Sequence, residues 1–220
     1  MKDEYTLKLE NVIEQMLQPL KNIPLSLVVS VISKYKVIPF NPNNTKDKKV
    51  LNMLKQVADI GGKEFNKKHI TSNRVNEIGN HIEKFVKDAL NKCNYKADVP
   101  MTKNGKKKAT GYPDIQFKDE FNRINYLECK TYNINNIGTT QRSFYLSPSE
   151  NFKITCNAHH FVLSYEIFVF KNKNGRNIYK CKSWKILSIE NLEVDVKYEF
   201  NSDNKRLYSK NLLLAEGEIK

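Results

Sequence analysis

The chain centres on two neighbouring stretches, GYPDIQF at residues 111–117 and NYLECKTY at residues 125–132. Aromatic and β-branched residues favour extended structure in both stretches, and turn-forming residues separate them. The side chains of a strand alternate between two faces, so Glu128 and Lys130 point the same way. Asp114 stands at the start of the first strand. Antiparallel pairing of the two strands would therefore bring Asp114, Glu128 and Lys130 to one spot.

Two carboxylates and a lysine at one spot suit the hydrolysis of a phosphodiester with a divalent metal ion. Such an ion polarises the phosphate and acidifies a water molecule. Mg²⁺ prefers oxygen ligands and is usually held by one or two carboxylates. We therefore predict that Asp114, Glu128 and the main-chain carbonyl of Cys129 bind Mg²⁺. We expect Lys130, whose ordinary pKa is about 10.4, to orient the attacking hydroxide as a cation, with a role as general base as the alternative.

An acidic residue two positions before a lysine is a common pattern in this lysine-rich chain. Three features single out Glu128 and Lys130 among its copies. Pro113-Asp114 is the only Pro-Asp dipeptide of the chain, both pieces lie in strand-like sequence, and an amphipathic helix precedes them. The alternative is an exposed hairpin with a surface ion pair. The pattern also occurs at Asp47-Lys49, Asp195-Lys197, Asp203-Lys205 and Glu218-Lys220.

The preceding helix is predicted by an apolar stripe with helical spacing that begins near Val75 and ends at Leu90. Ser72 is a candidate N-cap for this helix. Glu83 lies at the edge of the stripe. We consider it as a further metal ligand, and a solvated carboxylate on the flank of the helix is the alternative.

Residues 1–70 show helical periodicity and predict an N-terminal helical subregion, while residues 71–220 form the predicted core. Pro24 would open the second helix of this subregion, and Gly61-Gly62 would end the third. Its role stays open between scaffolding, DNA contact and dimer formation. We expect the two regions to form one compact unit.

Downstream of the central stretches, Ser147-Pro148-Ser149-Glu150 matches a capping box and predicts a short helix to about His159. Residues 161–170 and 178–187 read as further strands. The order of helices, strands, one helix and strands favours an α+β fold, with a central mixed sheet flanked by helices and an N-terminal helical lobe.

The formal net charge is +13, which favours a polyanionic partner such as nucleic acid, although a compositional bias towards Lys, Asn and Ile is a competing explanation. No apolar run is long enough to span a membrane, and no signal peptide is present, so we expect a cytoplasmic protein. The four cysteines are scattered without a C-x-x-C pair, which argues against a zinc site and a disulfide framework.

Polar residues on both sides of the central stretches are candidates for DNA contact. The lysines would bind phosphates, whereas glutamine and arginine side chains could read base edges. An ordinary solvated loop is the alternative for the segment that follows the second strand. The candidates are Lys106, Lys107, Lys108, Gln141, Arg142, Ser143 and Lys153.

Pro113-Asp114 and Glu128-Cys129-Lys130, on the second and third strands after a helix, resemble the PD-(D/E)xK nuclease superfamily, and most of all its type II restriction endonucleases. The resemblance covers residues 72–170. It implies Mg²⁺-dependent, site-specific cleavage of double-stranded DNA in a prokaryotic cytoplasm, commonly by a homodimer. It also implies that Asp114 and Glu128 are metal ligands, that Lys130 is the catalytic lysine and that Glu83 supports the metal site.

Two other functions are compatible with the sequence. The same chemistry would serve a DNA repair nuclease or junction resolvase, and the basic charge alone would serve a DNA-binding protein without catalysis. Discrete fragments from phage DNA in the presence of Mg²⁺ would separate a restriction enzyme from both.

Overall fold

The computed structural model describes residues 3–18, 20–72, 75–140, 142–173, 175–198, 202–207, 209 and 212. The chain forms two compact units, Pro24–Glu193 and the combination of Met1–Ile23 with Val194–Lys220. This division differs from the predicted one at residue 70, because the helices between residues 24 and 70 belong to the same unit as the sheet.

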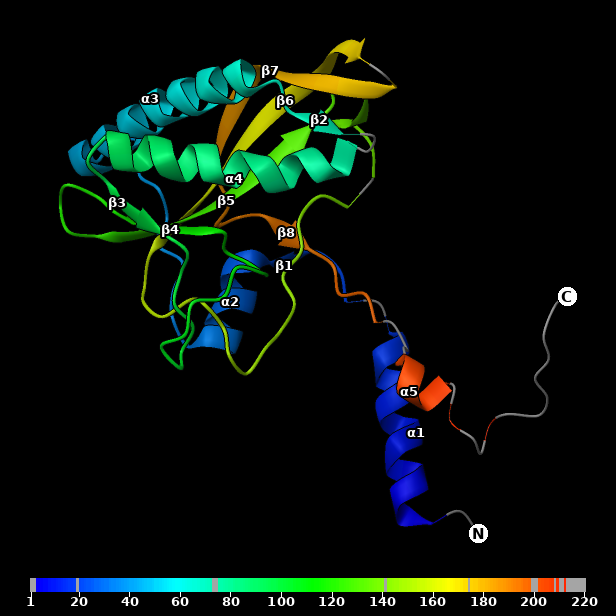
Figure 1. Ribbon diagram of the computed structural model, residues 1–220. Coiled ribbons are helices and arrows are strands. Elements are labelled where there is room, and N and C mark those ends of the chain that lie inside the picture. The colour runs from blue at the N-terminus through cyan, green and yellow to red at the C-terminus, as the bar shows by residue number, and fades with distance from the viewer. Residues whose placement is uncertain are drawn as a thin grey trace, which may run out of the picture. The chain divides into compact units, whose positions relative to one another are not determined.

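The larger unit is built on a six-stranded mixed sheet (Figure 1). Adjacent strands pair antiparallel, except for the two central strands β5 and β6, which are parallel. This arrangement confirms the predicted α+β fold with a central mixed sheet. In spatial order the strands are β2 (Thr71–Ser72), β7 (Arg176–Ser188), β6 (His159–Lys173), β5 (Ile124–Tyr132), β4 (Ile115–Lys118) and β3 (Lys96–Asp98).

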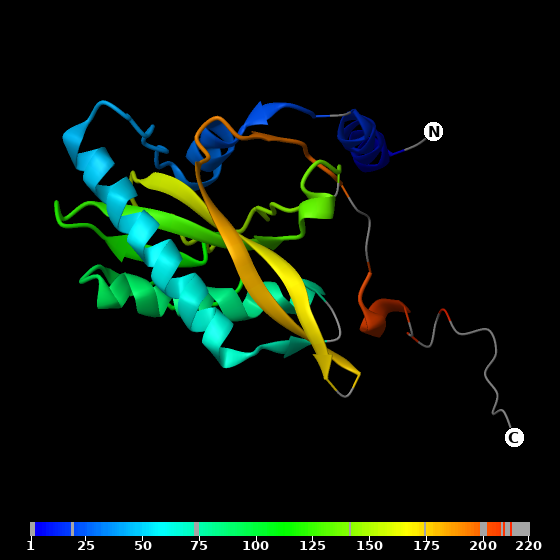
Figure 2. The same cartoon turned by 90° about the horizontal axis from the view of Figure 1, so that it is seen from above.

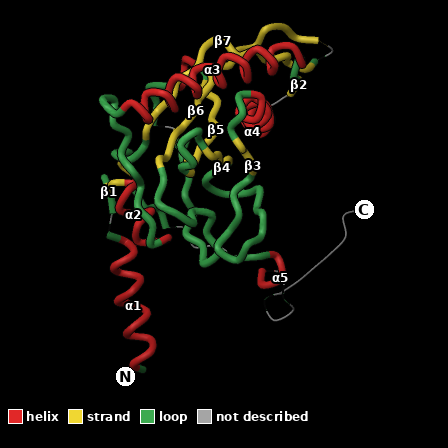
Figure 3. The backbone as a smooth tube through the Cα atoms, turned by 90° about the vertical axis from the view of Figure 1, so that its left-hand side faces the viewer, coloured by secondary structure: helices red, strands yellow, loops and turns green. Residues whose placement is uncertain are grey.

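Helices α3 (Thr45–Lys68) and α4 (Val75–Lys92) cover one face of this sheet, and α2 (Leu25–Ser33) lies on the other side (Figures 1 and 2). Figure 3 shows α3 and α4 as a layer of their own beside the strands. The main apolar core fills the space between this layer and the sheet. Its fully buried members include Leu54, Val57, Phe65, Ile78, Ile82, Val86, Leu127, Leu163 and Tyr165.

Helix α3 continues through Gly61-Gly62, so the predicted helix end at these glycines is wrong. A Cβ atom at Gly61 would lie 2.8 Å from the hydroxyl of Tyr165, and one at Gly62 would lie 3.1 Å from the Tyr165 ring. The Tyr165 hydroxyl donates to the carbonyl of Ala58 at 2.9 Å. These glycines therefore let the sheet approach the helix closely.

The segment that leads into β6 differs from the prediction, because residues 142–157 form no helix. Its polar groups bind distant parts of the chain instead. The carbonyl of Phe152 accepts from the Lys103 amide at 2.9 Å. The amide of Thr155 donates to the Tyr126 hydroxyl at 2.9 Å. These long-range partners replace the local hydrogen bonds that a helix would supply.

Helix α4 confirms the predicted amphipathic helix, and its apolar stripe from Ile78 to Leu90 is buried. Ser72 belongs to strand β2, and its hydroxyl donates to the carboxylate of Glu77 near the start of α4. The residues between β2 and α4 lie outside the described part of the chain.

In the smaller unit, Asp3 is the N-cap of α1 (Glu4–Leu17), and its carboxylate accepts from the Thr6 amide at 2.8 Å. A short helix, α5 (Asn204–Leu207), lies in the C-terminal part, and most residues beyond it are outside the described chain.

Two further strands, β1 (Ile23–Pro24) and β8 (Glu193–Val194), pair with each other. None of the helices that the structure describes has the length and apolar character needed to cross a membrane.

Candidate active site

The β4–β5 hairpin places Asp114 and Glu128 next to each other. Ile115 pairs with Leu127 in the antiparallel register, which sets the residue before β4 opposite Glu128. The Asp114 carboxylate accepts a hydrogen bond from the main-chain amide of Cys129 at 2.8 Å. The predicted pairing of the two central stretches is therefore confirmed.

Glu128 is a buried carboxylate with one satisfied oxygen. Its side chain points to the same face as Lys130, and the Lys130 Nζ donates to Glu128 Oε1 at 2.7 Å. The residue is only 4% exposed. Its second oxygen, Oε2, is buried and has no hydrogen-bond partner among the described residues. A buried carboxylate oxygen without a partner is costly, so this atom favours a cation or a proton.

The charged form of both carboxylates is disfavoured at this site. Burial is the main cause that raises the pKa of Asp114, and the amide of Cys129 and the charge of Lys130 partly offset it. Burial and the neighbouring charge of Asp114 raise the pKa of Glu128 to about 7. Since both shifts disfavour the charged form, this pair provides a site that favours positive charge.

Lys130 is held as a cation beside this pair. Burial by itself would lower the pKa of Lys130, but the charges of Glu128 and Asp114 outweigh it, so the net shift is upward. A raised pKa keeps the amine protonated at neutral pH, which suits a cation better than a general base.

Glu83, on helix α4, interacts electrostatically with Asp114. Burial and the charge of Asp114 raise the pKa of Glu83 to about 7. Within the described ranges, however, no three His, Cys, Asp or Glu side chains form a cluster that could hold a metal ion. The structure thus brings Asp114 and Glu128 together, while Glu83 contributes charge from the neighbouring helix.

Lys153 is a second buried cation at the site. It is 3% exposed, and its Nζ donates to the carbonyl of Pro113 at 2.6 Å. Burial lowers the pKa of Lys153, against the opposing charges of Asp114 and Glu128. The sequence pattern placed this lysine on a helix. The structure places it in an irregular segment, where it also lines a cavity of about 50 Å³ together with Lys108.

Tyr112 anchors the main chain that carries Asp114. Its hydroxyl and Nδ1 of His160 are 2.5 Å apart, and the two rings stack with centroids 5.8 Å apart. Burial lowers the pKa of His160 to about 3, so the imidazole is neutral. The sequence offered no signal for this contact beyond a tyrosine before Pro113. Both His159 and His160 are buried.

The remaining candidates for DNA contact lie in exposed loops. Lys106, Lys107 and Lys108 are exposed, and Lys107 forms an ion pair with Asp98. The Arg142 guanidinium lies 5.4 Å from the centroid of the Tyr145 ring. Ser143 is exposed in the same segment, and Gln141 lies outside the described residues.

A mixed sheet that carries two carboxylates and a lysine on adjacent strands is compatible with a nuclease of the restriction-endonuclease class. Residues 19–211 match the type II restriction enzyme MjaV family, and the chain belongs to that family. It is 40% identical to the type II restriction enzyme MjaV of Methanocaldococcus jannaschii, over 98% of each chain.

A solved structure of the tetrameric restriction endonuclease SfiI bound to cognate DNA is also similar, with 14% identity and a TM-score of 0.39. That match covers 64% of this chain and 62% of the SfiI chain.

Membership of this family confirms the resemblance to type II restriction endonucleases. The protein is a site-specific restriction endonuclease and binds DNA. The alternatives of a repair nuclease, a junction resolvase and a non-catalytic DNA-binding protein are set aside.

Proposed function

We propose that this enzyme hydrolyses phosphodiester bonds of double-stranded DNA at Asp114, Glu128 and Lys130, within a short specific sequence. One observation supports this placement of the active site. Glu128 Oε2 is buried beside a second carboxylate and has no partner in the part of the chain that the structure describes. Nothing in the packing of a stable core requires such an arrangement, and it stabilises positive charge at this point.

The donor set fits a divalent cation. Asp114 and Glu128 would hold Mg²⁺ together with the main-chain carbonyl of Cys129, because hard oxygen ligands suit this ion. The cation would satisfy Glu128 Oε2 and offset the repulsion between the carboxylates. When bound, it supplies charge stabilisation at the phosphate and a more acidic water molecule. Glu83 would add negative charge from α4.

Lys130 would position the reactants. Its ammonium group is held by Glu128 at 2.7 Å and stays protonated because its pKa is raised. In this state it donates hydrogen bonds to the attacking water and to a phosphate oxygen, which aligns them and stabilises developing negative charge.

The exposed polar loops would hold the DNA. Lys106, Lys107 and Lys108 would contact phosphates next to the cleaved bond, which orients the duplex without reading its sequence. The segment with Gln141, Arg142 and Ser143 lies between β5 and β6 in the sequence, and its amide and guanidinium groups could reach base edges. Lys153 is buried, so its role would be to support Pro113 rather than to bind phosphate.

We further propose a homodimer. Two copies related by a two-fold axis would present one site to each strand of a palindromic sequence. This arrangement explains how a chain with one carboxylate pair could cut both strands.

Calorimetric titration with Mg²⁺ tests the metal site without relying on activity. We expect the wild-type enzyme to bind Mg²⁺ and Glu128→Gln to bind it at least about tenfold more weakly, because a charged ligand is lost. Asp88→Asn is the matched control, since Asp88 is an exposed carboxylate on α4. Equal binding by wild type and Glu128→Gln would refute the proposed ligand set.

A further inference from the structure

The hairpin of β6 and β7 continues beyond the end of its neighbour β5. The last pair between β5 and β6 joins Tyr132 to Glu166, whereas β6 runs on to Lys173, which is 173 − 166 = 7 residues further. At about 3.3 Å per residue this extension is roughly 23 Å long. Figure 2 shows the two strands running on together, and β2 pairs with β7 near the tip, at Asn177 and Ile178. We call residues 167–185 the hairpin arm.

The hairpin arm is strongly basic. It contains no aspartate or glutamate, so its cations are not balanced by acidic residues of the arm itself. A second copy of the same arm would be repelled, whereas a polyanion would be attracted. The six cations are Lys171, Lys173, Arg176, Lys180, Lys182 and Lys185.

Part of this charge lies on the same face of the sheet as the candidate active site. Ser164 pairs with Lys130 on one side and with Lys185 on the other, and residues paired in this way share a face. The Lys185 Nζ lies 5.8 Å from the centroid of the Tyr132 ring. A line of cations therefore begins at Lys130 and leads onto the hairpin arm.

The line continues further along the arm. Lys182 approaches Glu166 at 3.4 Å with its own side chain 67% exposed, and Glu166 is the residue paired with Tyr132. Phe168 pairs with Lys180, which places these two side chains on one face. The cations thus extend outward from the site.

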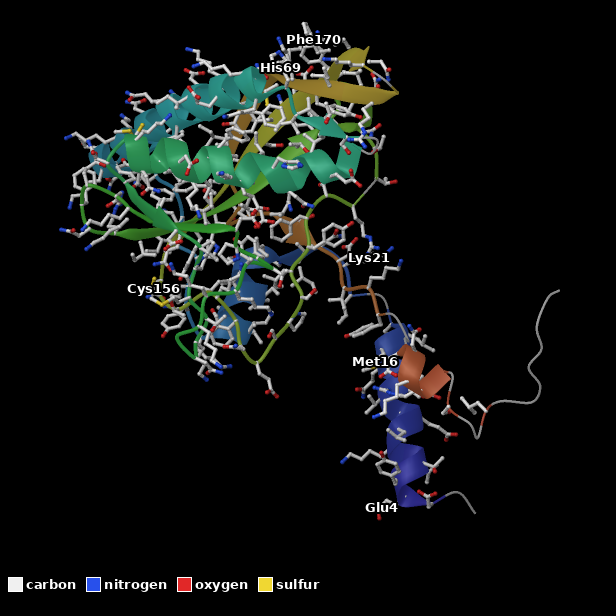
Figure 4. All side chains as sticks on the ribbon, in the orientation of Figure 1. Glu4, Met16, Lys21, His69, Cys156 and Phe170 are labelled. Atoms are coloured by element: carbon white, nitrogen blue, oxygen red, sulfur yellow. The ribbon has the colours of Figure 1, made fainter. Side chains whose placement is uncertain are left out.

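The arm also exposes apolar side chains near its tip. Phe168, Val169 and Phe170 are 38%, 48% and 46% exposed. The Lys180 Nζ lies 3.8 Å from the centroid of the Phe170 ring, and Figure 4 shows Phe170 at the outer part of the hairpin. Aromatic groups next to cations suit a sugar-phosphate backbone, where sugars offer apolar surface and phosphates offer charge.

We propose that the hairpin arm binds the backbone of the DNA duplex that leads away from the cleaved bond. The proposal rests on the placement of the reaction at Asp114, Glu128 and Lys130. The reach of the arm corresponds to about seven base pairs at roughly 3.4 Å each. The arm would increase affinity for DNA and would not read its sequence, because its contacts are with phosphates and sugars.

This role is tested by measuring how the binding of a cognate duplex depends on salt concentration. The enzyme is used as purified, whether it is a dimer or a monomer. The probe is a fluorescent duplex that carries the cleaved sequence, identified from the ends of digestion products, and binding is measured with a chelator present. The triple variant Lys180→Gln, Lys182→Gln and Lys185→Gln should lower the slope of log K against log salt by about 2 to 3. Since no cleavage is needed, an error in the proposed catalytic residues would not affect this result.

The matched control removes the same charge from the helical layer on the opposite face of the sheet. Lys48, Lys55 and Lys63 are exposed on α3, and their replacement by glutamine should leave the slope unchanged. The single variant Lys185→Gln, which should lower the slope by about 0.9, serves if the triple variant does not fold. A duplex that ends at the cleaved bond should bind the wild type and the triple variant equally.

An equal slope for the triple variant and the wild type would overturn the proposal. It would also be overturned if the triple variant changed from dimer to monomer in sedimentation while keeping the wild-type slope, because the arm would then be a protein interface.

Discussion

At the scale of single residues, the central feature is a carboxylate pair that is poorly satisfied in the absence of a cation. Asp114 has a hydrogen bond from Cys129, but one oxygen of Glu128 has no partner among the residues described. An unsatisfied buried oxygen lowers stability, which is more typical of the proposed functional site than of a structural ion pair.

Glu128 should make the stability of the metal-free enzyme depend on pH. Its pKa rises from 4.5 to about 7 on folding, so the folded state holds the proton more tightly. The resulting stabilisation is complete below pH 4.5 and is lost as the pH rises through about 7, and it amounts to roughly 3 kcal/mol at most. The free energy of unfolding should be measured with urea and a chelator at about pH 5 and about pH 8. Its decrease between these two pH values should be smaller for Glu128→Gln than for wild type. An equal loss in both proteins would contradict the buried position of this carboxylate.

Lys153 should contribute both to stability and to cleavage. Lys153→Met keeps an apolar side chain but leaves the buried Pro113 carbonyl without its donor. We expect the free energy of unfolding to fall by about 1 to 3 kcal/mol. We also expect cleavage to fall at least about tenfold, because the main chain next to Asp114 loses its support.

Lys63→Met is the control for this variant, because Lys63 is exposed on α3, away from the proposed site. Thermal unfolding and single-turnover cleavage measure the two effects. If Lys153→Met cleaved DNA at the wild-type rate, this lysine would have no part in positioning the site.

The sequence was sufficient to predict Asp114, Glu128 and Lys130 as neighbours, since strand alternation and hairpin pairing are local rules. The contact between Lys153 and Pro113 was not predictable in this way. It joins residues 40 positions apart through a segment without regular structure. No periodic pattern in the sequence predicts such a contact.

At the scale of elements, the close approach of α3 to the sheet explains why glycine occurs within a long helix. Glycine in a helix normally lowers stability by about 0.5 to 1 kcal/mol relative to alanine. Gly61 is retained in the core because a larger residue would meet the Tyr165 hydroxyl. The sequence pattern alone does not distinguish this role from a helix end, since the opposing surface comes from a strand about a hundred residues later.

Two alanine substitutions should therefore have opposite effects. Gly61→Ala should lower the free energy of unfolding by about 1 to 3 kcal/mol, because its Cβ would lie 2.8 Å from the Tyr165 hydroxyl. Gly79→Ala on α4 should raise it by about 0.5 to 1 kcal/mol, because the nearest atom is 3.6 Å away. Chemical denaturation of both variants checks this pair. Stabilisation by Gly61→Ala would show that the helix and the sheet are not in close contact there.

The segment before β6 shows where local signals fail at this scale. Its capping-box pattern favours a helix, but the Phe152 carbonyl and the Thr155 amide are bound by groups from elsewhere in the chain. Tertiary hydrogen bonds override local propensity when they satisfy the same backbone groups.

At the scale of the whole molecule, family membership establishes a restriction endonuclease, while the assembly is a matter for solution measurements. One chain has a mass of 25.7 kDa, so a dimer would have a mass of 2 × 25.7 = 51.4 kDa. We expect sedimentation equilibrium of the wild-type enzyme to give the dimer mass, because two sites are needed to cut both strands symmetrically. A monomer mass in the presence and absence of DNA would contradict this expectation.

The most direct test of the proposed active site is single-turnover cleavage of the cognate duplex with Mg²⁺ by Asp114→Ala and Lys130→Ala. Each variant should fold, bind DNA and cleave at least about a thousandfold more slowly than wild type, because charge stabilisation at the phosphate is lost. Asp88→Ala, on the exposed face of α4, should cleave at the wild-type rate. Full activity in Asp114→Ala or in Lys130→Ala would contradict the placement of the reaction at this site.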